Sequence, residues 1–160
     1  MTGAGTPPPV CLRAVEDVGR AALLAVRVAP HQARFVPDVA ATLDEAAAMP
    51  EVHLRAVCLA DREPPAVVGL LMYALDRDDR APWIYRLLID HDSQGRGLGG
   101  AALEAAVAEL ARAYPLRPAV YIGVRPENTD ARTLYARHGF QPDGREIGGE
   151  IVLRRVMRGR

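Results

Sequence analysis

The sequence predicts a mixed β-sheet with helices packed on it, and three observations lead to this fold class. Apolar runs of strand length alternate with stretches of helical pattern, in the order β-α-α-β-β-β-α-β-α-β-β. Some neighbouring strands are joined by short turns, as in hairpins, whereas others are joined by helices, as in crossovers. The chain has 160 residues, of which 49% are apolar, enough for one ordinary domain with a packed core.

The first elements follow a proline-containing lead-in over residues 1–9. This lead-in has neither the basic nor the apolar region of a secretory signal, so we expect it to be disordered and the folded domain to span residues 10–160. Val10–Val15 reads as a strand. Acidic residues then open a helix from Glu16 to about Val28, which ends before a proline.

Two strands and a short helix come next. Thr42 is a candidate N-cap for a helix over Leu43–Met49, which ends at a proline. The apolar runs Val52–Ala60 and Ala66–Leu75 read as strands, and the Asp- and Pro-rich segment between them predicts a turn.

The second half of the chain begins with Trp83–Asp90, a nearly continuous apolar strand for which we expect burial on both faces. Ala101–Ala113 has a strong helical pattern. Four further features complete the chain: a strand over Pro118–Val124, a helix over Asn128–His138, its C-terminal stop at Gly139, and one or two strands over Phe140–Met157.

Composition excludes several classes of function. The formal net charge is zero, which argues against a general affinity for nucleic acid or anionic membranes. No apolar run reaches the ~18–20 residues that span a bilayer, and we expect a cytoplasmic protein. The four histidines are scattered along the sequence, so no metal site is predicted. Cys11 and Cys58 lie in apolar runs and are interpreted as small buried side chains.

The stretch QGRGLGG, Gln94 to Gly100, is the most distinctive feature of the sequence. Glycines allow backbone N–H groups to approach phosphate oxygens, and the helix that follows directs its positive end at the same anion. The stretch fits both the dinucleotide pattern G-x-G-x-x-G and the coenzyme A pattern Q-x-x-G-x-G. A dinucleotide fold needs this loop after its first strand, whereas here it follows the fourth. A P-loop is excluded because the chain has no lysine, and a purely structural turn remains the alternative.

Two longer pieces resemble motifs of the GNAT family of N-acetyltransferases. LLIDHDSQGRGLGGAALEAAV resembles motif A, and ENTDARTLYARHGFQPDG resembles motif B, in the family's order. The resemblance covers nearly all of the chain after the lead-in. It implies an α+β fold in which about four helices flank a twisted, mostly antiparallel sheet of six to seven strands. It also implies acetyl-CoA as co-substrate, held between two splayed strands.

The resemblance assigns cofactor contacts to specific positions. Backbone groups of the strand would bond the pantetheine arm, the glycine stretch would wrap the pyrophosphate, and motif B residues would line the path. These positions are Leu88, Ile89, Gln94, Gly95, Arg96, Gly97, Leu98, Gly99, Gly100, Asn128, Ala131, Tyr135 and Arg137. For Arg96 the alternative is a solvated turn residue. For Asn128 it is a simple helix cap, and for Arg137 it is an interaction with the helix dipole.

Tyr135 occupies the motif position that implies a general acid, because a phenol with a pKa near ~10 keeps its proton at neutral pH. The alternative is a packing role for its ring. The strand at Trp83–Asp90 contains no glutamate, so the general base is unassigned and a water is favoured. Simple alternation places Arg86 and Asp90 on one face of that strand and Tyr85 on the other.

A finer resemblance links QARFVPDVAATL, WIYRLLID and GGEIV to bacterial spermine/spermidine (diamine) acetyltransferases of the Blt type. It implies a small polyamine as acceptor, with Glu150, Phe35 and Asp38 as candidate acceptor contacts. Three alternatives stay open: another small amine, an acetyltransferase for protein N-termini, and a non-catalytic coenzyme A sensor. The family resemblance also raises the prospect of a homodimer.

Overall fold

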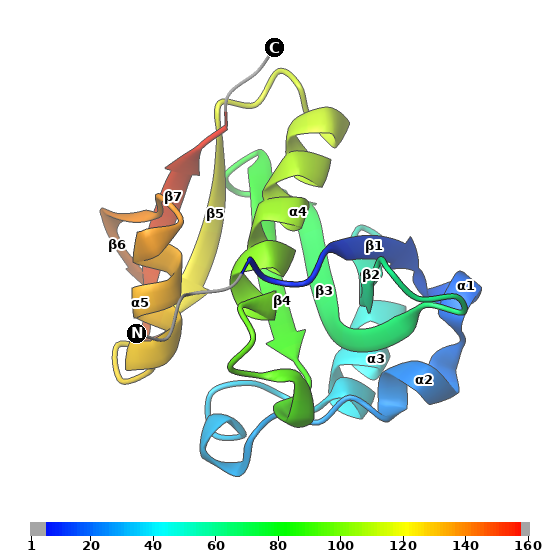
Figure 1. Ribbon diagram of the computed structural model, residues 1–160. Coiled ribbons are helices and arrows are strands. Elements are labelled where there is room, and N and C mark those ends of the chain that lie inside the picture. The colour runs from blue at the N-terminus through cyan, green and yellow to red at the C-terminus, as the bar shows by residue number, and fades with distance from the viewer. Residues whose placement is uncertain (1–5, 158–160) are drawn as a thin grey trace.

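The computed structural model describes residues 6–157, which form one seven-stranded sheet with helices on both faces (Figure 1). Its strand order is β1-β2-β3-β4-β5-β7-β6, and only the β4–β5 pair is parallel. The strands are β1 Val10–Ala14, β2 His53–Leu59, β3 Ala66–Asp76, β4 Ala81–Ile89, β5 Ala119–Val124, β6 Gln141–Ile147 and β7 Glu150–Val156. The prediction of a mixed, mostly antiparallel sheet is confirmed.

In the described residues, five α-helices and two 3₁₀ turns connect the strands. The helices are α1 Val15–Val18, α2 Arg20–Leu24, α3 Val39–Ala47, α4 Leu98–Ala113 and α5 Thr129–Arg137, and the 3₁₀ turns are η1 Pro30–Gln32 and η2 His91–Ser93. No helix in residues 6–157 is both long and apolar enough to cross a membrane.

The sheet buries a different apolar cluster on each face. The larger cluster packs α4 and Tyr135 of α5 against the sheet, with Leu103, Leu110 and Phe140 fully or almost fully buried. The smaller cluster packs α2 and α3 on the other face, where Leu23 is fully buried. Burial of apolar surface of this kind is the main favourable contribution to folding.

The predicted helix from Glu16 to Val28 is wrong in its length. Gly19 adopts a φ of 83°, which separates the short helices α1 and α2, and the helical run ends at Leu24. The predicted cap of the next helix is also wrong. α3 begins four residues earlier than expected, because Asp38 caps it by accepting a hydrogen bond from the Ala41 N–H at 2.8 Å, while Thr42 is buried inside the helix.

The expected burial of β4 on both faces is confirmed: Ile84 belongs to the larger cluster on one face and Leu88 to the smaller cluster on the other, and no residue of the strand is exposed. The expected alternation along β4, by contrast, fails at one point. Ile84 pairs with Tyr73 of β3 and Arg86 pairs with Met72, so Tyr85 is an extra, bulged residue. Tyr85 and Arg86 therefore line the same cavity instead of pointing to opposite faces.

β4 and β5 form a wedge, which is the feature of the fold that matters most for the site. They pair only at Trp83 with Tyr121 and at Ile84 with Ile122, and this is here called the closed end. Beyond these pairs, within the described part of the chain, residues 85–89 of β4 and 123–124 of β5 are not paired with each other. This is here called the open end, and the two strands separate visibly there (Figure 1). The splayed strands expected from the sequence are present.

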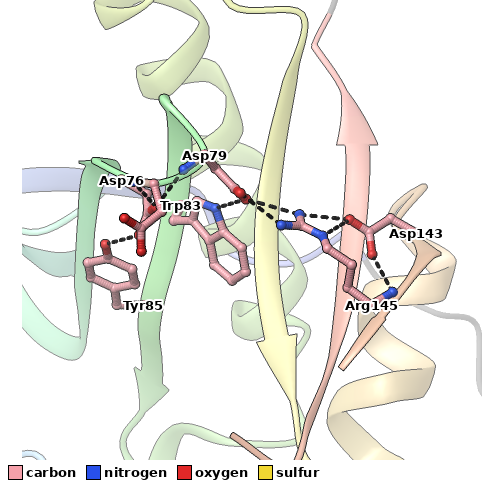
Figure 2. Close-up of polar contacts among 7 residues, drawn as sticks. Asp76, Asp79, Trp83, Tyr85, Asp143 and Arg145 are labelled. Carbon is pink, nitrogen blue, oxygen red and sulfur yellow. Dashed lines mark hydrogen bonds and ion pairs between the residues drawn. The ribbon is translucent and has the colours of Figure 1, made fainter. Parts of the chain in front are cut away.

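A polar cluster holds the closed end (Figure 2). Arg145 of β6 donates hydrogen bonds to both carboxylate oxygens of Asp79, at 2.8 and 3.0 Å, and its side chain pairs with Asp143 at 2.8 Å. Asp79 also accepts a bond from the indole N–H of Trp83 at 2.8 Å. The Trp83 ring stacks on Tyr121 across the two strands, with ring centroids 5.7 Å apart. The cluster thus ties the β3–β4 hairpin to β6.

The lead-in contacts the body of the protein at two described points, one of which is the Pro9 carbonyl, which accepts a hydrogen bond from the Ala60 N–H at 2.9 Å. At the other, Pro7 lies against Gly97, because a Cβ built on this glycine would come within 3.0 Å of the proline Cβ. Residues 1–5, which fall within the expected disordered segment, lie outside the described residues.

Candidate functional site

The glycine turn connects η2 to α4 at the open end of the wedge. Gly95 and Gly97 both have a φ of 77°, a left-handed conformation that side-chain-bearing residues rarely adopt. A Cβ on Gly95 would meet nothing within 4 Å, so the backbone conformation, not lack of space, is what favours glycine there. The sequence pattern therefore corresponds to a tight turn with a real conformational requirement.

The N-terminus of α4 follows directly from this turn. Its N-cap is Gly97, which supplies no side-chain acceptor for the first N–H groups of the helix. These groups, together with the positive end of the helix dipole, form an environment suited to an anion such as a phosphate.

At Gly100 the requirement for glycine is steric and not conformational. A Cβ at this position would come within 2.6 Å of the Nε2 atom of His138. The His138 ring occupies that space, and its Nδ1 atom lies 2.7 Å from Glu104 of α4. Gly100 therefore lets α5 pack closely on α4 at the same time as it lines the site.

Gln94 links the turn to β4. Its amide donates to the Ile89 carbonyl at 3.0 Å and to Gln32 at 2.8 Å, and Gln32 donates back at 3.3 Å. The Ile89 carbonyl therefore already has a side-chain partner. Gln32 was not among the predicted site residues, although it lies in the QARFVPDVAATL segment that carries the finer resemblance.

A cavity of about 300 Å³ lies along the glycine turn, the open end of β4 and α5, and is here called the turn cavity. It brings together nearly all the residues predicted to contact a cofactor: Leu88, Ile89, Gln94, Gly95, Gly97, Leu98, Gly99, Gly100, Asn128, Ala131 and Tyr135. Arg96 and Arg137 are exposed and do not line it. Seven lining residues were not predicted as cofactor contacts: Val28, Gln32, Phe35, Val36, Leu87, Asp130 and Leu134.

Asn128 has the capping role that was considered as its alternative. Its side-chain oxygen accepts a hydrogen bond from the Ala131 N–H at 3.3 Å and so caps α5. The residue also lines the turn cavity. Capping and cavity lining are compatible, because the cap uses only the amide oxygen.

Tyr135 lies on α5 with its ring 6.0 Å from that of Phe140. The side chain is almost completely buried, and burial raises the pKa of its hydroxyl to about 12, with a further contribution from the negative charge of Glu150. Because the pKa is raised, the hydroxyl keeps its proton throughout the neutral and mildly alkaline range and can act as a proton donor.

A second cavity of about 440 Å³ adjoins the turn cavity and is here called the carboxylate cavity. Its charged lining residues are Glu45, Arg86, Arg125 and Glu150. Glu45 and Arg86 form an ion pair at 2.7 Å. Glu45, Arg86 and Arg125 were not predicted, because they come from three elements that only the fold brings together.

The three predicted acceptor contacts have different locations. Glu150 lines the carboxylate cavity, and Phe35 lines both cavities. Asp38 lines neither cavity, because its carboxylate is engaged as the N-cap of α3.

The two cavities share part of their lining, here called the junction: Phe35, Val36, Leu87, Asn128 and Tyr135. The turn cavity has a glycine turn and a helix N-terminus suited to phosphates. The carboxylate cavity has Glu150 and Arg125 in addition to the Glu45–Arg86 ion pair. The buried Tyr135 hydroxyl, which holds its proton, is part of the lining common to both.

Comparisons with known proteins give a consistent result. The family model described as "Acetyltransferase (GNAT) family" matches residues 28–140. The chain is 32% identical to the spermine/spermidine N(1)-acetyltransferase of Bacillus subtilis over 149 residues, which cover 89% of this chain and 95% of that protein.

Solved structures show the same fold at lower identity. An acetyltransferase from Thermus thermophilus matches with a TM-score of 0.68 at 22% identity, over 92% of this chain and 97% of that chain. Mycobacterium smegmatis RimJ, solved in complex with CoA-disulfide, matches with a TM-score of 0.68 at 22% identity, over 94% of this chain and 86% of that chain.

Proposed function

The chain belongs to the GNAT family of acetyltransferases, and on that premise we propose that it transfers an acetyl group from acetyl-CoA to a primary amine of a small polyamine. The family and the curated relatives make it an N-acetyltransferase. The observation that carries the finer proposal is the position of Tyr135, at the junction of a phosphate-suited cavity and a carboxylate-lined one.

The turn cavity fits acetyl-CoA in its chemistry. The uncapped N–H groups of α4 and the left-handed glycines Gly95 and Gly97 suit the pyrophosphate. The edge of β4 at residues 85–88, which has no β5 partner, suits an extended pantetheine arm, as a peptide adds to a sheet edge. When bound, acetyl-CoA supplies the activated acetyl thioester.

Tyr135 would act as general acid at the junction. Its hydroxyl holds a proton that it can donate to the departing sulfur, and the raised pKa keeps that proton in place at neutral pH. Burial also excludes water from the hydroxyl, which strengthens its interactions with developing charge.

The carboxylate cavity would receive the acceptor. A polyamine is cationic at neutral pH, and Glu150 presents a carboxylate to the cavity near Tyr135. The similarity to an enzyme named for spermine and spermidine, which extends over most of both chains, supports a polyamine acceptor.

Two other functions remain candidates from the sequence. An acetyltransferase for protein N-termini would use the same fold with a peptide in the carboxylate cavity. A coenzyme A sensor would bind the cofactor in the turn cavity and transfer nothing. Turnover with amines separates the sensor from both enzymes, and the choice of amine separates the two enzymes.

The test is release of free thiol from acetyl-CoA by the purified protein, with spermine, spermidine, putrescine, amino acids and short peptides as acceptors. The proposal predicts saturable release with the polyamines and an acetylated polyamine in the mass spectrum. Release only with peptides would refute the polyamine acceptor. Binding of acetyl-CoA without release for any acceptor would favour the sensor.

A further inference from the structure

Gly123 and Glu150 form a complementary pair at the open end of the wedge. Gly123 follows Ile122, the last β5 residue paired with β4. A Cβ built on Gly123 would lie 3.3 Å from both the carboxyl carbon and the Oε1 atom of Glu150. Glu150 begins β7, which pairs with β5 through Val124 and Ile151. The glutamate side chain therefore crosses β5 and fills the position that a side chain at residue 123 would occupy.

The other charged and titratable residues that line the carboxylate cavity come from three elements and from the segment after β5. They are Tyr135 of α5, Arg125 after β5, Tyr85 and Arg86 of β4, and Glu45 of α3. Arg86 is held by Glu45 at 2.7 Å, and the Tyr85 hydroxyl donates to Asp76 at 2.8 Å. Within residues 6–157, Glu150 makes no ion pair shorter than 4.0 Å.

Glu150 is thus the carboxylate of this cavity that is not already neutralised by a described arginine. Glu150 and Tyr135 line the same cavity, and the negative charge of Glu150 helps to raise the pKa of the Tyr135 hydroxyl. A cationic amine drawn toward Glu150 would therefore be brought to the junction where Tyr135 lies.

We propose that Glu150 removes the proton from the acceptor's ammonium group, directly or through one water, and that Gly123 is the positioning residue that lets its carboxylate reach the junction. This inference rests on the proposed function. It assigns the general base that the sequence of β4 does not supply.

An N–H bond of the ammonium breaks, its electron pair stays on nitrogen, and an O–H bond forms on Glu150. Formation of the amide from the neutral amine removes a second proton from nitrogen, and this proton restores the one that Tyr135 gives to the sulfur. Glu150 releases its proton to solvent through the cavity, so one turnover releases one proton in total.

Such a base is needed because an alkylamine has a pKa near ~10.4, so that only about one molecule in 2,500 is neutral at pH 7. Positioned general bases typically contribute about 10²–10⁴-fold in rate. For Glu150→Gln we expect a fall in kcat of about 100-fold with spermidine. Binding of acetyl-CoA, measured by calorimetry, should be unchanged, because Glu150 does not line the turn cavity.

The discriminating experiment varies the pKa of the acceptor. Wild type and Glu150→Gln are compared with spermidine and with an amine of low pKa such as glycinamide, over pH 6.5 to about 10. The defect of the variant should be large for spermidine at neutral pH and should shrink at high pH and with the low-pKa amine. The α-amino group of such an amine has a pKa near ~8, so a far larger fraction of it is already neutral and its reaction depends less on a base. Glu146→Gln, an exposed β6 glutamate outside both cavities, is the matched control and should behave as wild type.

A second variant tests the positioning role. Gly123→Ala would force the carboxylate to move by a few tenths of an ångström, and it should lower kcat several-fold without weakening acetyl-CoA binding. Spermidine binding to the coenzyme A-loaded protein, followed by calorimetry, should change less than kcat in both variants.

The inference is overturned if Glu150→Gln raises KM with kcat and its pH profile unchanged, because Glu150 would then only bind the amine. It is also overturned if the defect is the same for amines of every pKa. Wild-type protein that acetylates none of the amines would instead overturn the proposed function, and the inference with it.

Discussion

The two ends of the β4–β5 wedge use the same pair of strands in opposite ways. At the closed end, backbone pairing continues to Ile84 and Ile122, and Arg145 satisfies two carboxylates beside a stacked pair of aromatic rings. At the open end, the β4 edge at residues 85–89 has no β5 partner in the described structure, and a glycine turn and two cavities lie beside it.

The two ends therefore differ in their hydrogen-bonding groups: those of the closed end are paired within the protein, whereas some of those at the open end are available to a substrate. The side chains of the closed end already hydrogen-bond to one another (Figure 2). They therefore stabilise the fold and are not available to bind a ligand. The open end has backbone groups, a helix N-terminus and a carboxylate that a substrate would complete. Changes at the open end should therefore alter catalysis, and changes at the closed end should alter stability.

The largest effect is expected from Tyr135→Phe, which removes one hydroxyl at the open end. We expect kcat to fall by about 10²–10⁴-fold, because the proton donor is lost while the ring still packs on Phe140. Steady-state kinetics and acetyl-CoA titration of the same preparation measure the two effects separately.

Tyr121→Phe is the matched control, because it makes the same change in a tyrosine stacked at the closed end. It should leave kcat within about twofold of wild type. If Tyr135→Phe weakened acetyl-CoA binding as much as it lowered kcat, Tyr135 would have a packing role and the distinction between the two ends would fail.

A smaller effect, on stability and not on catalysis, is expected from Arg145→Met at the closed end. The guanidinium is partly exposed, so we expect a loss of about 1 kcal/mol in the free energy of unfolding, between the values for exposed and buried charged hydrogen bonds. For a chain of this size that corresponds to a fall in Tm of roughly 3 °C. Arg62→Met, in the exposed turn between β2 and β3, is the control. A large loss of kcat in Arg145→Met without a change in Tm would contradict the assignment of the closed end to stability and the open end to catalysis.

The pH dependence of this stability difference follows from Asp79. The hydrogen bond from Arg145 lowers the pKa of Asp79, burial opposes the shift, and the bond from Trp83 adds to it. A carboxylate with a lowered pKa stabilises the fold above its ordinary pKa of ~3.9 and loses that contribution as the pH falls through the lowered value. The difference between wild type and Arg145→Met in urea unfolding should therefore be full at pH 7 and should shrink below about pH 4.

Much of this contrast could be predicted from the sequence, because it depends on local patterns. The glycine turn, the tyrosine of α5 and the order of strands and helices all follow from short segments whose spacing has a physical meaning. Errors in the helices had local causes as well. Gly19 takes a left-handed conformation inside an otherwise helical stretch, and Asp38 is a strong cap that competed with Thr42.

The features that could not be predicted depend on contacts between distant segments. The bulge at Tyr85 shifts every later side chain of β4 relative to simple alternation, and nothing in WIYRLLID marks it. The pairing of Glu45 with Arg86 and the closeness of Glu150 to Gly123 join residues that are 41 and 27 positions apart. A single sequence carries no sign of such pairs until the sheet order is known.

The central claim is that the open end of the wedge binds acetyl-CoA through the glycine turn, and calorimetric titration of coenzyme A tests it most directly. Wild type is compared with Gly95→Ala and Gly144→Ala, two glycines with positive φ and no atom within 4 Å of an added Cβ. Each substitution should cost about 1–2 kcal/mol of backbone strain. Only Gly95→Ala should weaken coenzyme A binding, by roughly tenfold, because Gly144 lies in β6 and lines neither cavity. Equal affinity in all three proteins, or no binding by wild type, would contradict the account.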